Sequence, residues 1–479
     1  MNRKALALAI ALLVSMSALG FYHVQTSAGN PTSLGGANSG STTNTSRITG
    51  PSSSTSTTQA TTAVSGQSAD WVTYHHDNSR DGYTVSNLTS ISPKWNSSQL
   101  DGQVYAEPLV FERAVFVVTE NNSVYSLNAS NGSINWRINL GAPVPRAALV
   151  CGNIDPTGIT GTPVIDPVSR LIYVVTFLNP THHVLFAIGI DDPRIRFNRS
   201  ADPVGMDPSI HQQRGALTLA NGYVYVPYGG LIGDCGPYHG WVAGIPSDGS
   251  GAMISYQVPT GREGGLWAPS GPAVGPSGNL YFATGNGDSS TSFDHGDSVV
   301  QLTPDLRELD FFAPTNWASL NEQDTDLGST GPAFVGAGML FQIGKQGVGY
   351  LLNASSLGGI GGQLFSLPVC GSSFGGVAYS APLVFVPCTD GLTVLRVTDS
   401  TFAVAWRVRD FSAGPPIVTG HIVWTVDLGS GVIHAFSAEN GTSLFSLNIG
   451  SPAHFTTPSY GDGYVFVAAS DHIYAFGQA

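Results

Sequence analysis

The 479-residue sequence is poor in charge, since only 11% of its residues are Asp, Glu, Lys or Arg, against roughly 25% in an ordinary soluble domain. Its 19 Lys and Arg residues form no basic run, and the formal net charge is −13. Binding to nucleic acid needs clustered cations that neutralise phosphates. The composition therefore argues against nucleic acid as a partner, and its wealth of Ser, Thr, Asn and Gly is typical of an exported protein.

Long amphipathic patterns with helical spacing are missing beyond the N-terminus. The sequence offers instead 59 glycines, 30 prolines and many short apolar segments that alternate with polar residues. The clearest example, Val104–Gly141, contains four short segments of this kind, separated by Asn-Asn and Asn-Gly. Such turns favour antiparallel hairpins, so the pattern predicts an all-β fold.

Cysteine is scarce, with Cys151, Cys235, Cys370 and Cys388 as the only four. Four cysteines in an exported chain predict two disulfides, for which three pairings exist. Cys370 and Cys388 bracket one strand pair, so we expect them to be joined, which leaves Cys151 to Cys235. Free buried thiols are the alternative. The spacing matches no zinc motif, and no haem-binding Cys-x-x-Cys-His occurs.

Residues 1–28 combine a basic start, Asn2-Arg3-Lys4, with an apolar run that begins at Ala5. Continued to Val24, the run reaches the length needed to span a bilayer, yet its first half alone would serve as the core of a signal peptide. A cleaved signal peptide and an N-terminal membrane anchor both remain open. Either one predicts an extracytoplasmic protein, secreted or anchored to the cell surface.

Residues 29–69 are rich in Ser, Thr and Gly and have almost no large apolar side chains. Such a segment cannot bury a core, and we expect a disordered stalk. Nine Asn-x-Ser/Thr sequences raise the possibility of glycosylation. Two of them, at Asn131 and Asn440, coincide with expected hairpin turns, where Asn-Gly serves the backbone in any case.

Residues 70–479 contain a repeat of about 50 residues, in which a marker dipeptide precedes each apolar strand. The eight markers are Glu107-Pro108, Thr162-Pro163, Ala216-Leu217, Gly271-Pro272, Gly331-Pro332, Ala381-Pro382, Pro415-Pro416 and Thr457-Pro458. Proline is tolerated at the start of a strand, where its missing N–H does no harm. Eight units of about four strands predict an eight-bladed β-propeller of antiparallel blades.

The last repeat ends at Ala479, one strand short of a complete blade. The lone segment Ser92–Asn96 has no blade of its own, and we expect it to supply the missing outer strand. This pairing would close the ring and remove the exposed sheet edges. The preceding segment, Trp71–Gly82, would then lie across a rim of the propeller.

The segment Tyr125-Ser-Leu-Asn-Ala-Ser-Asn-Gly, followed by Trp136, is similar to the quinoprotein repeat VYALDAxTGxxxW. His434-Ala-Phe-Ser-Ala-Glu-Asn-Gly repeats it. From Trp71 to Ala479 the chain thus resembles the PQQ-binding-like propeller proteins, which are related to the quinoprotein alcohol dehydrogenases (PQQ is pyrroloquinoline quinone). The resemblance implies a functional site at the mouth of the central channel. Non-enzymatic scaffold proteins share the same repeat, so it does not imply catalysis.

Six residues of the middle repeats match functional positions of the dehydrogenases in the same order. They are Asp234 (metal), Trp267 (stacking on the quinone), Asn286 (metal), Asp324 (catalytic), Asp326 (metal) and Lys345 (contact with the quinone). Oxygen ligands suit Ca²⁺, an indole face can support a planar ring, and a carboxylate can act as general base. If the resemblance extends to the site, these side chains should converge on one pocket above Trp267.

The sequence also departs from the dehydrogenases. Their vicinal cysteine pair is absent, because Cys151 is followed by Gly152, and Asp234 stands where they have a glutamate. Asx side chains in Gly-rich turns also cap their own backbone, which gives Asp234, Asn286, Asp324 and Asp326 a purely structural interpretation. Trp267 could simply pack between blades, and Lys345 is the residue that such roles explain least. One hypothesis is a cell-surface scaffold that binds a protein or small-molecule ligand at the channel mouth. The other is a PQQ- and Ca²⁺-dependent dehydrogenase of alcohols or sugars, with Asp324 catalytic; a purely structural surface protein is a third possibility.

Overall fold

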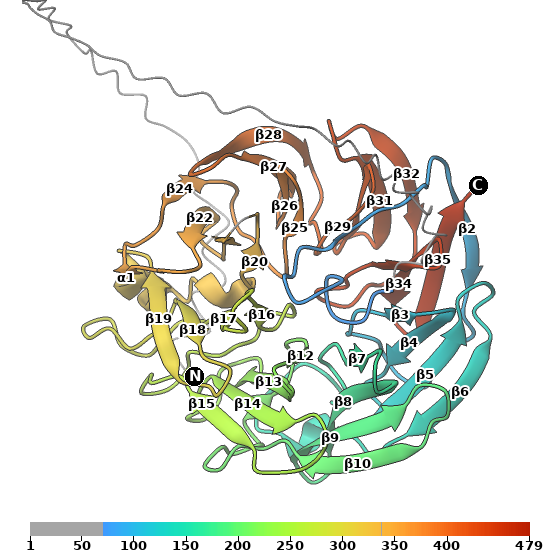
Figure 1. Cartoon of the computed structure of the whole chain (residues 1–479), viewed down its shortest axis with the longest axis horizontal. Coiled ribbons are helices and arrows are strands. Elements are labelled where there is room, and N and C mark those ends of the chain that lie inside the picture. The colour runs from blue at the N-terminus through green and yellow to red at the C-terminus, as the bar shows by residue number, and fades with distance from the viewer. Residues whose placement is uncertain (1–69, 337) are drawn as a thin grey trace, which may run out of the picture. The chain divides into compact units, whose positions relative to one another are not determined.

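The computed structural model describes residues 70–336 and 338–479. Its eight β-sheets surround a central axis as the blades of a propeller (Figure 1), which confirms the predicted fold. The expected signal peptide or anchor and the stalk lie outside the described residues. Within those residues no helix is long and apolar enough to cross a membrane.

The first four blades follow one another along the chain, and each has four antiparallel strands counted outward from the axis. Blade 1 contains β3 (Leu109–Phe111), β4 (Ala114–Val118), β5 (Ser123–Asn128) and β6 (Ile134–Asn139); blade 2 contains β7 (Val164–Asp166), β8 (Leu171–Leu178), β9 (His182–Gly189) and β10 (Ile195–Ser200). Blade 3 contains β12 (Thr218–Ala220), β13 (Tyr223–Gly230), β14 (Trp241–Pro246) and β15 (Ile254–Gln257), with β11 (His211–Gln212) also paired to β13. Blade 4 contains β16 (Ala273–Val274), β17 (Leu280–Ala283), β18 (Val299–Leu302) and β19 (Glu308–Ala313), extended by β23 (Gly359–Ile360).

The remaining blades follow the same plan. Blade 5 contains β20 (Ala333–Phe334), β21 (Met339–Gln342), β22 (Val348–Asn353) and β24 (Phe365–Pro368), and blade 6 contains β25 (Ala378–Ser380), β26 (Leu383–Cys388), β27 (Gly391–Val397) and β28 (Phe402–Arg409). Blade 7 contains β29 (Ile417–Thr419), β30 (Ile422–Asp427), β31 (Val432–Ser437) and β32 (Ser443–Asn448), with β1 (Tyr83–Thr84) parallel to β29. Blade 8 contains β33 (Ser459–Gly461), β34 (Tyr464–Ala469), β35 (His472–Gln478) and β2 (Ile91–Asn96). The helix α1 (Trp317–Gln323) and the 3₁₀ turns η2 (Arg146–Ala148) and η3 (Leu327–Ser329) lie in connections.

Burial falls from the axis outward. The second strands β4, β8 and β13 are buried almost throughout, whereas the outer strands β6 and β32 are mostly exposed. Neighbouring blades cover both faces of the inner strands, which is why those strands are continuously apolar. The short apolar runs of the sequence therefore mark the inner part of each blade.

The tryptophan of the repeat motif explains how neighbouring blades are joined. Trp136 on the outer strand of blade 1 donates its indole N–H to the Ile190 carbonyl of blade 2 at 3.0 Å. Trp406 of blade 6 bonds the Ala438 carbonyl of blade 7 in the same way, at 3.2 Å. The glycine of the Asn-Gly turn lies beneath the indole, since a Cβ at Gly441 would come within 2.7 Å of the Trp406 ring.

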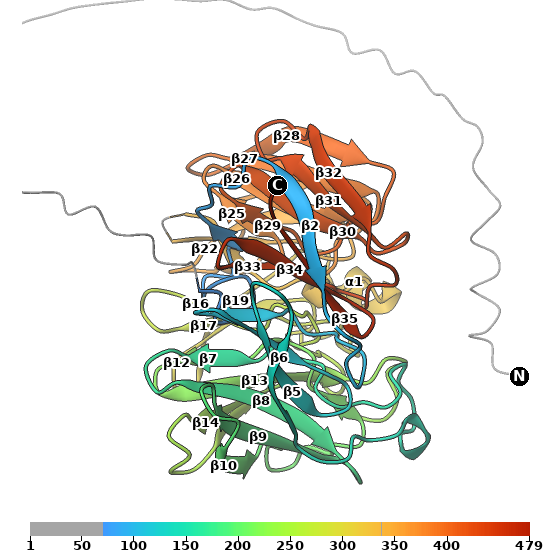
Figure 2. The same ribbon diagram turned by 90° about the vertical axis from the view of Figure 1, so that its right-hand side faces the viewer.

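The ring is closed by the N-terminal strand, as predicted. Strand β2 pairs antiparallel with β35 and lies beside it in both views (Figures 1 and 2). Trp95 on β2 then repeats the contact between blades, because its indole N–H bonds the Ala129 carbonyl of blade 1 at 2.9 Å. A Cβ at Gly132 would lie 2.5 Å from the Trp95 ring, so this position requires glycine.

One of the eight markers was placed wrongly. Ala381-Pro382 does not precede the inner strand of blade 6 but follows it, in the turn between β25 and β26. The inner strand begins at Ala378, after Gly375-Gly376-Val377. Gly375-Gly376-Val377 and Ala381-Pro382 both resemble the start of a strand in sequence. The predicted number of blades was therefore correct, but the marker of blade 6 was assigned to the second strand instead of the first.

The segment Trp71–Gly82, predicted to lie across a rim, instead crosses one end of the central channel. Together with β1 it forms residues Trp71–Thr84, here named the channel plug. Trp71, Tyr74, His75 and Arg80 are almost fully buried. The plug runs across the inner strands at the end of the channel away from the loops that carry the candidate site. Its backbone carbonyls accept hydrogen bonds from one inner-strand N–H in each of six blades: Val110, Ile165, Val274, Phe334, Tyr379 and Val418. Thr73 and Asn78 bond carbonyls of blade 3, so seven blades are connected.

Arg80 fixes the centre of the plug. Its guanidinium donates five hydrogen bonds, to the carbonyls of Tyr74, Leu217 and Pro272 and to the hydroxyls of Thr73 and Thr218, at 2.6–3.3 Å. Burial lowers its pKa to about 10. Because every acceptor is itself buried, the plug depends on this one cation.

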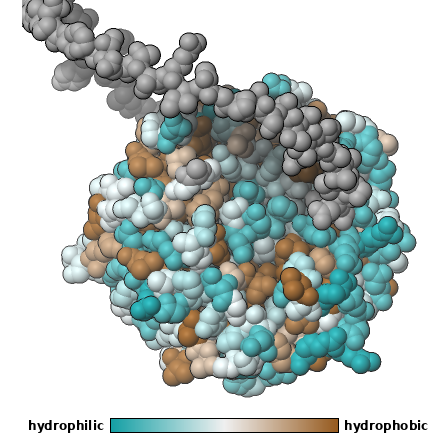
Figure 3. Space-filling view, viewed as in Figure 1, coloured by the Kyte–Doolittle hydropathy of each residue, from teal (hydrophilic) through white to brown (hydrophobic). Residues whose placement is uncertain are grey.

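The two predicted disulfides are present, Cys151–Cys235 and Cys370–Cys388. On the face shown in Figure 3, hydrophilic and hydrophobic residues are intermixed. Exposed apolar side chains such as Val85, Val168 and Val204 belong to separate connections, which is ordinary for a protein surface.

Replacing Arg80 by Met should lower the free energy of unfolding by about 3–5 kcal/mol, because five buried hydrogen bonds from a charged donor are lost. The midpoint of unfolding in guanidinium chloride measures this change. Arg396 is exposed on β27, so Arg396→Met is the matched control and should leave the midpoint unchanged. Equal midpoints for the two variants would show that the plug does not hold the ring together.

Candidate functional site

The topology of the blades places the six predicted residues on one face. In each blade the connection from the second to the third strand and the connection to the next blade emerge at the same end of the channel. Asp234, Asn286 and Lys345 occupy connections of the first kind, after β13, β17 and β21. Trp267 precedes β16, and Asp324 and Asp326 follow the end of α1, in connections of the second kind.

All six line a single pocket at the channel mouth. Its volume is about 250 Å³, slightly below the roughly 300–1,000 Å³ of sites that bind small molecules. The structure thus brings together every residue that the resemblance assigned to the site. Their assigned roles remain predictions.

Lys345 is at the centre of an ion-pair network. Its ammonium lies 2.8 Å from the Asp324 carboxylate and also contacts Asp326. Asp326 is buried, and its other oxygen accepts the backbone N–H of Asn286 at 2.7 Å. Burial alone would lower the pKa of Lys345, but the charges of Asp326 and Asp324 outweigh it and raise the pKa. The ammonium therefore stays charged and lies 5.5 Å from the centre of the Trp267 ring.

Glu263 is a member of this cluster that the sequence prediction missed. Its carboxylate accepts the side-chain N–H of Asn286 at 2.8 Å and pairs with Arg262 at 2.9 Å. Burial raises its pKa; Arg262 opposes the shift, and the charges of Asp234, Asp288 and Asp326 add to it. Glu263 stands in a Gly-rich turn, Thr260–Gly265, four residues before Trp267, which is the same signal that identified Asp234 and Asn286.

Asp234 is exposed at the edge of the pocket. Its carboxylate accepts the hydroxyl of Tyr238 at 2.8 Å. This bond fixes the carboxylate in a turn where Asp234 itself has a φ of 49°. Asp234, which is shorter than the glutamate of the dehydrogenases at this position, is thus held in place by Tyr238.

The inner wall of the pocket is aromatic. Phe455 and Phe374 lie 6.1 and 6.4 Å from the Trp267 ring, and His454 lies 3.9 Å from Phe455, between ring centres. These residues come from the connections that precede blades 6 and 8. No local motif marks them in the sequence, because they meet Trp267 only when the ring closes.

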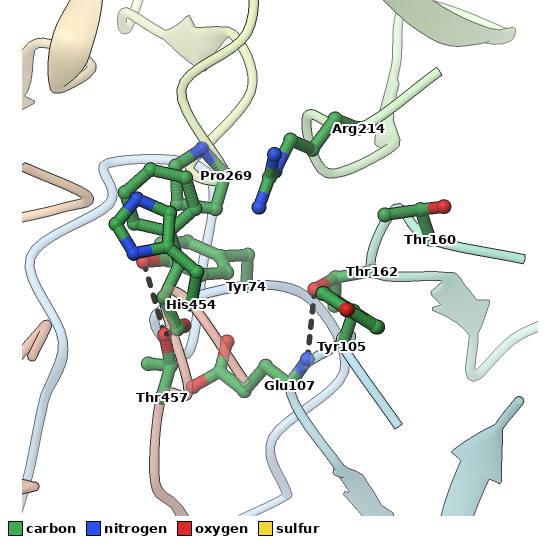
Figure 4. Close-up of a pocket in the computed structure, with 10 residues that line it drawn as sticks. Tyr74, Tyr105, Glu107, Thr160, Thr162, Arg214, Pro269, His454 and Thr457 are labelled. Carbon is green, nitrogen blue, oxygen red and sulfur yellow. Dashed lines mark hydrogen bonds between the residues drawn. The ribbon is translucent and has the colours of Figure 1, made fainter. Parts of the chain in front are cut away.

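A smaller polar chamber lies beneath this wall, between the mouth and the plug (Figure 4). Arg214, His454 and Phe455 line both spaces. The chamber has room for about 10 Å³, which is about one water molecule. Its lower part includes Glu107, whose carboxylate accepts the Trp71 indole N–H at 3.0 Å and the His75 backbone N–H at 2.9 Å.

Glu120 is a buried carboxyl close to this chamber. One oxygen accepts the Gly158 N–H at 2.6 Å, and the other has no partner among the described residues. Burial raises its pKa to about 7, although the hydrogen bond from Gly158 opposes the shift. Glu120 is therefore neutral in mild acid and becomes charged near neutral pH.

The donors near the mouth have the chemistry that suits a hard cation with a planar ring beside it, but no three of the described carboxylates there have oxygens within 4.8 Å of one another. Oxygens of Asp234, Glu263, Asn286 and Asp326 are of the type that Ca²⁺ prefers. Burial is the main cause of the raised pKa of Glu263, and the charges of Asp234, Asp288 and Asp326 add to it; a cation would relieve this repulsion. Trp267 is partly exposed at the pocket wall and can support a ring.

Comparison with known proteins agrees with this fold. Residues 92–157 match the family of the outer membrane protein assembly factor BamB. Similar structures include a quinohemoprotein alcohol dehydrogenase from Pseudomonas putida (15% identity, 85% of this chain and 80% of that chain covered, TM-score 0.69). A europium-containing methanol dehydrogenase is also similar (14% identity, 85% of this chain and 98% of that chain covered, TM-score 0.66). So is BamB from Moraxella catarrhalis (15% identity, 81% of this chain and 99% of that chain covered, TM-score 0.55).

At these identities the likeness shows the fold, which is that of the PQQ-type propellers, as the repeat motif predicted. No curated protein matches the sequence. The similar structures include both dehydrogenases and an assembly factor, so the fold is compatible with either function inferred from the sequence.

Replacing Lys345 by Met should destabilise the protein by about 3–5 kcal/mol, because the buried Asp326 carboxylate loses its counter-charge. Asp326→Asn removes that charge, so the double variant should recover part of the loss in a double-mutant cycle of unfolding midpoints. Lys94→Met, at an exposed position on β2, is the control. Additive effects of the two substitutions would contradict the ion-pair network.

The raised pKa of Glu120 predicts a pH dependence. A carboxyl whose folded pKa exceeds its unfolded value contributes stability below the unfolded pKa of 4.5 and loses it as pH rises through about 7. From pH 5 to pH 8, the wild type should therefore lose about 2–3 kcal/mol more unfolding free energy than Glu120→Gln. Parallel pH profiles would mean that Glu120 is not buried as a neutral acid.

Proposed function

We propose that this protein is an extracytoplasmic propeller that binds a planar ligand together with a hard cation at its channel mouth. PQQ with Ca²⁺ is the pair that the residues fit best. The observation that carries the proposal is the convergence of six residues, selected from sequence alone, on one pocket. They come from five separate connections between β13 and β22, so purely local turn-forming roles do not account for their meeting.

The charges of the pocket support this pairing. The ammonium of Lys345 offsets only part of the charge of Asp324 and Asp326, and Arg262 pairs with Glu263. Asp234 has no cationic partner among the described residues, so the cluster keeps an excess of negative charge. The cation would be held by Asp234, Glu263, Asn286 and Asp326, and the ring would lie beside Trp267 and Lys345.

The proposed location rests on the N-terminal sequence and on the two disulfides, which persist in oxidising compartments. Residues 1–28 would direct export and could tether the protein to a membrane, and residues 29–69 would hold the propeller away from it. A protein partner at the channel mouth is the other form of the scaffold hypothesis. The scarcity of basic residues makes nucleic acid an unsuitable partner.

A second candidate function is oxidation of an alcohol or sugar. It is favoured by Asp324, whose carboxylate is exposed at the mouth beside Lys345. Bound PQQ would supply the acceptor for the two electrons of the substrate. Asp324 would take the proton of the substrate hydroxyl as general base. The sequence lacks a haem-binding motif, so electrons would pass to a separate acceptor.

The test is titration of the purified protein with PQQ, with and without Ca²⁺, followed by the absorbance of the quinone. Binding should require Ca²⁺, and Trp267→Leu should weaken it at least about tenfold through loss of stacking. Trp317→Leu, outside the pocket, should bind like the wild type. Absence of binding, or equal affinity in both variants, would overturn the proposed site.

Dye reduction by the loaded protein, with ethanol and glucose as substrates, tests the second candidate separately. Asp324→Asn should abolish dye reduction while PQQ affinity stays within about threefold of the wild type. Binding without dye reduction in the wild type would leave the protein a ligand-binding propeller and rule out oxidation of these substrates.

A further inference from the structure

We infer that the ligand of the channel mouth carries an anionic group at its inner end and that Arg214 binds this group. The inference rests on the proposed function for the place of the ligand. It adds a binding residue that sequence analysis did not select and a constraint on the class of ligand.

Arg214 is placed where a ligand of the mouth would end. It lies in the connection from β11 to β12 and lines both the mouth and the chamber beneath it. Its guanidinium carbon lies 4.7 Å from the centre of the Phe455 ring, which is itself 6.1 Å from that of Trp267. Phe455 thus lies between the stacking surface of Trp267 and the guanidinium of Arg214.

The guanidinium of Arg214 has no partner within residues 70–336 and 338–479. No hydrogen bond or ion pair joins it to the protein, and its Nη2 is buried. Figure 4 shows it pointing into the space between His454 and Thr162. Arg80, by contrast, donates five hydrogen bonds, and Lys345 contacts two carboxylates.

The carboxyl groups of Glu107 and Glu120 form no ion pair with the guanidinium of Arg214. Glu107 is engaged by Trp71 and His75, and Glu120 by Gly158. Burial raises the pKa of both carboxyls, which favours their neutral forms. A buried cation without a contacting anion is costly, so an anion supplied by a ligand would gain a strong, already positioned partner.

The surroundings define the group that fits. A guanidinium presents two parallel N–H donors, which match a carboxylate best. The chamber beyond Arg214 has room for about one water molecule, so the ligand ends at this point. Asp234 and Asp326 line the mouth but not the chamber, and Glu263 adjoins them through its hydrogen bond with Asn286. The fitting ligand is therefore a planar ring compound with a carboxylate directed inward and a cation-chelating edge directed outward.

The experiment compares three probes in calorimetric titrations with Ca²⁺ present: PQQ, its trimethyl ester and naphthalene-2,6-dicarboxylate. Arg214→Gln should weaken PQQ binding about 10–100-fold, the effect of losing hydrogen bonds to a charged group. Arg214→Lys should recover part of the affinity. Each variant should bind the ester, which has no carboxylate, as the wild type does. Arg396→Gln is the exposed control, and unfolding midpoints verify that each variant is folded.

The outcomes separate this inference from the proposed function. If PQQ binds wild type and Arg214→Gln equally, the inference is overturned while the proposed function stands. If PQQ does not bind the wild type, the proposed function fails, and the dicarboxylate decides the inference. Dicarboxylate binding that is lost in Arg214→Gln supports an anion site at Arg214. No binding, or binding that the substitution leaves unchanged, overturns it.

Discussion

Aromatic contacts between neighbouring blades set the geometry on which the rest of the propeller depends. An indole N–H on one outer strand reaches a carbonyl of the next blade, and a turn glycine makes room for the ring. This contact fixes the blade spacing and explains why the repeat couples an Asn-Gly turn to a tryptophan. Three of the eight outer strands, β6, β28 and β2, carry such a tryptophan. The other five outer strands have none, so the contact recurs at intervals around the ring.

The sequence was sufficient for features that repeat or that a motif marks. The period of about 50 residues predicted eight blades, and the lone strand at Trp95 predicted the closure. Arg214 and Phe455 could not be predicted, because their roles arise from contacts across the ring between distant blades. The plug was also missed as a structural element, since six of its contacts with the inner strands are made by backbone carbonyls, which leave no pattern in the sequence.

The electrostatics of the channel differ along its axis. Carboxylates gather at the outer mouth around Lys345, whereas Arg214 lies at the inner wall and Arg80 in the plug. Glu107 and Glu120 are buried between these levels, where low polarity favours their uncharged forms. The channel thus has a negative entrance and a positive interior. This arrangement suits a ligand that binds a cation at its outer end and carries negative charge at its inner end.

The pairing of β2 with β35 also constrains how the protein is made. These strands come from opposite ends of the propeller sequence, so blade 8 cannot form until β35 has been synthesised. The plug, which immediately precedes β2, needs the inner strands of seven blades before its hydrogen bonds can form. Ring closure is therefore a late step of folding, and the edges of the unfinished ring must be protected from aggregation until then.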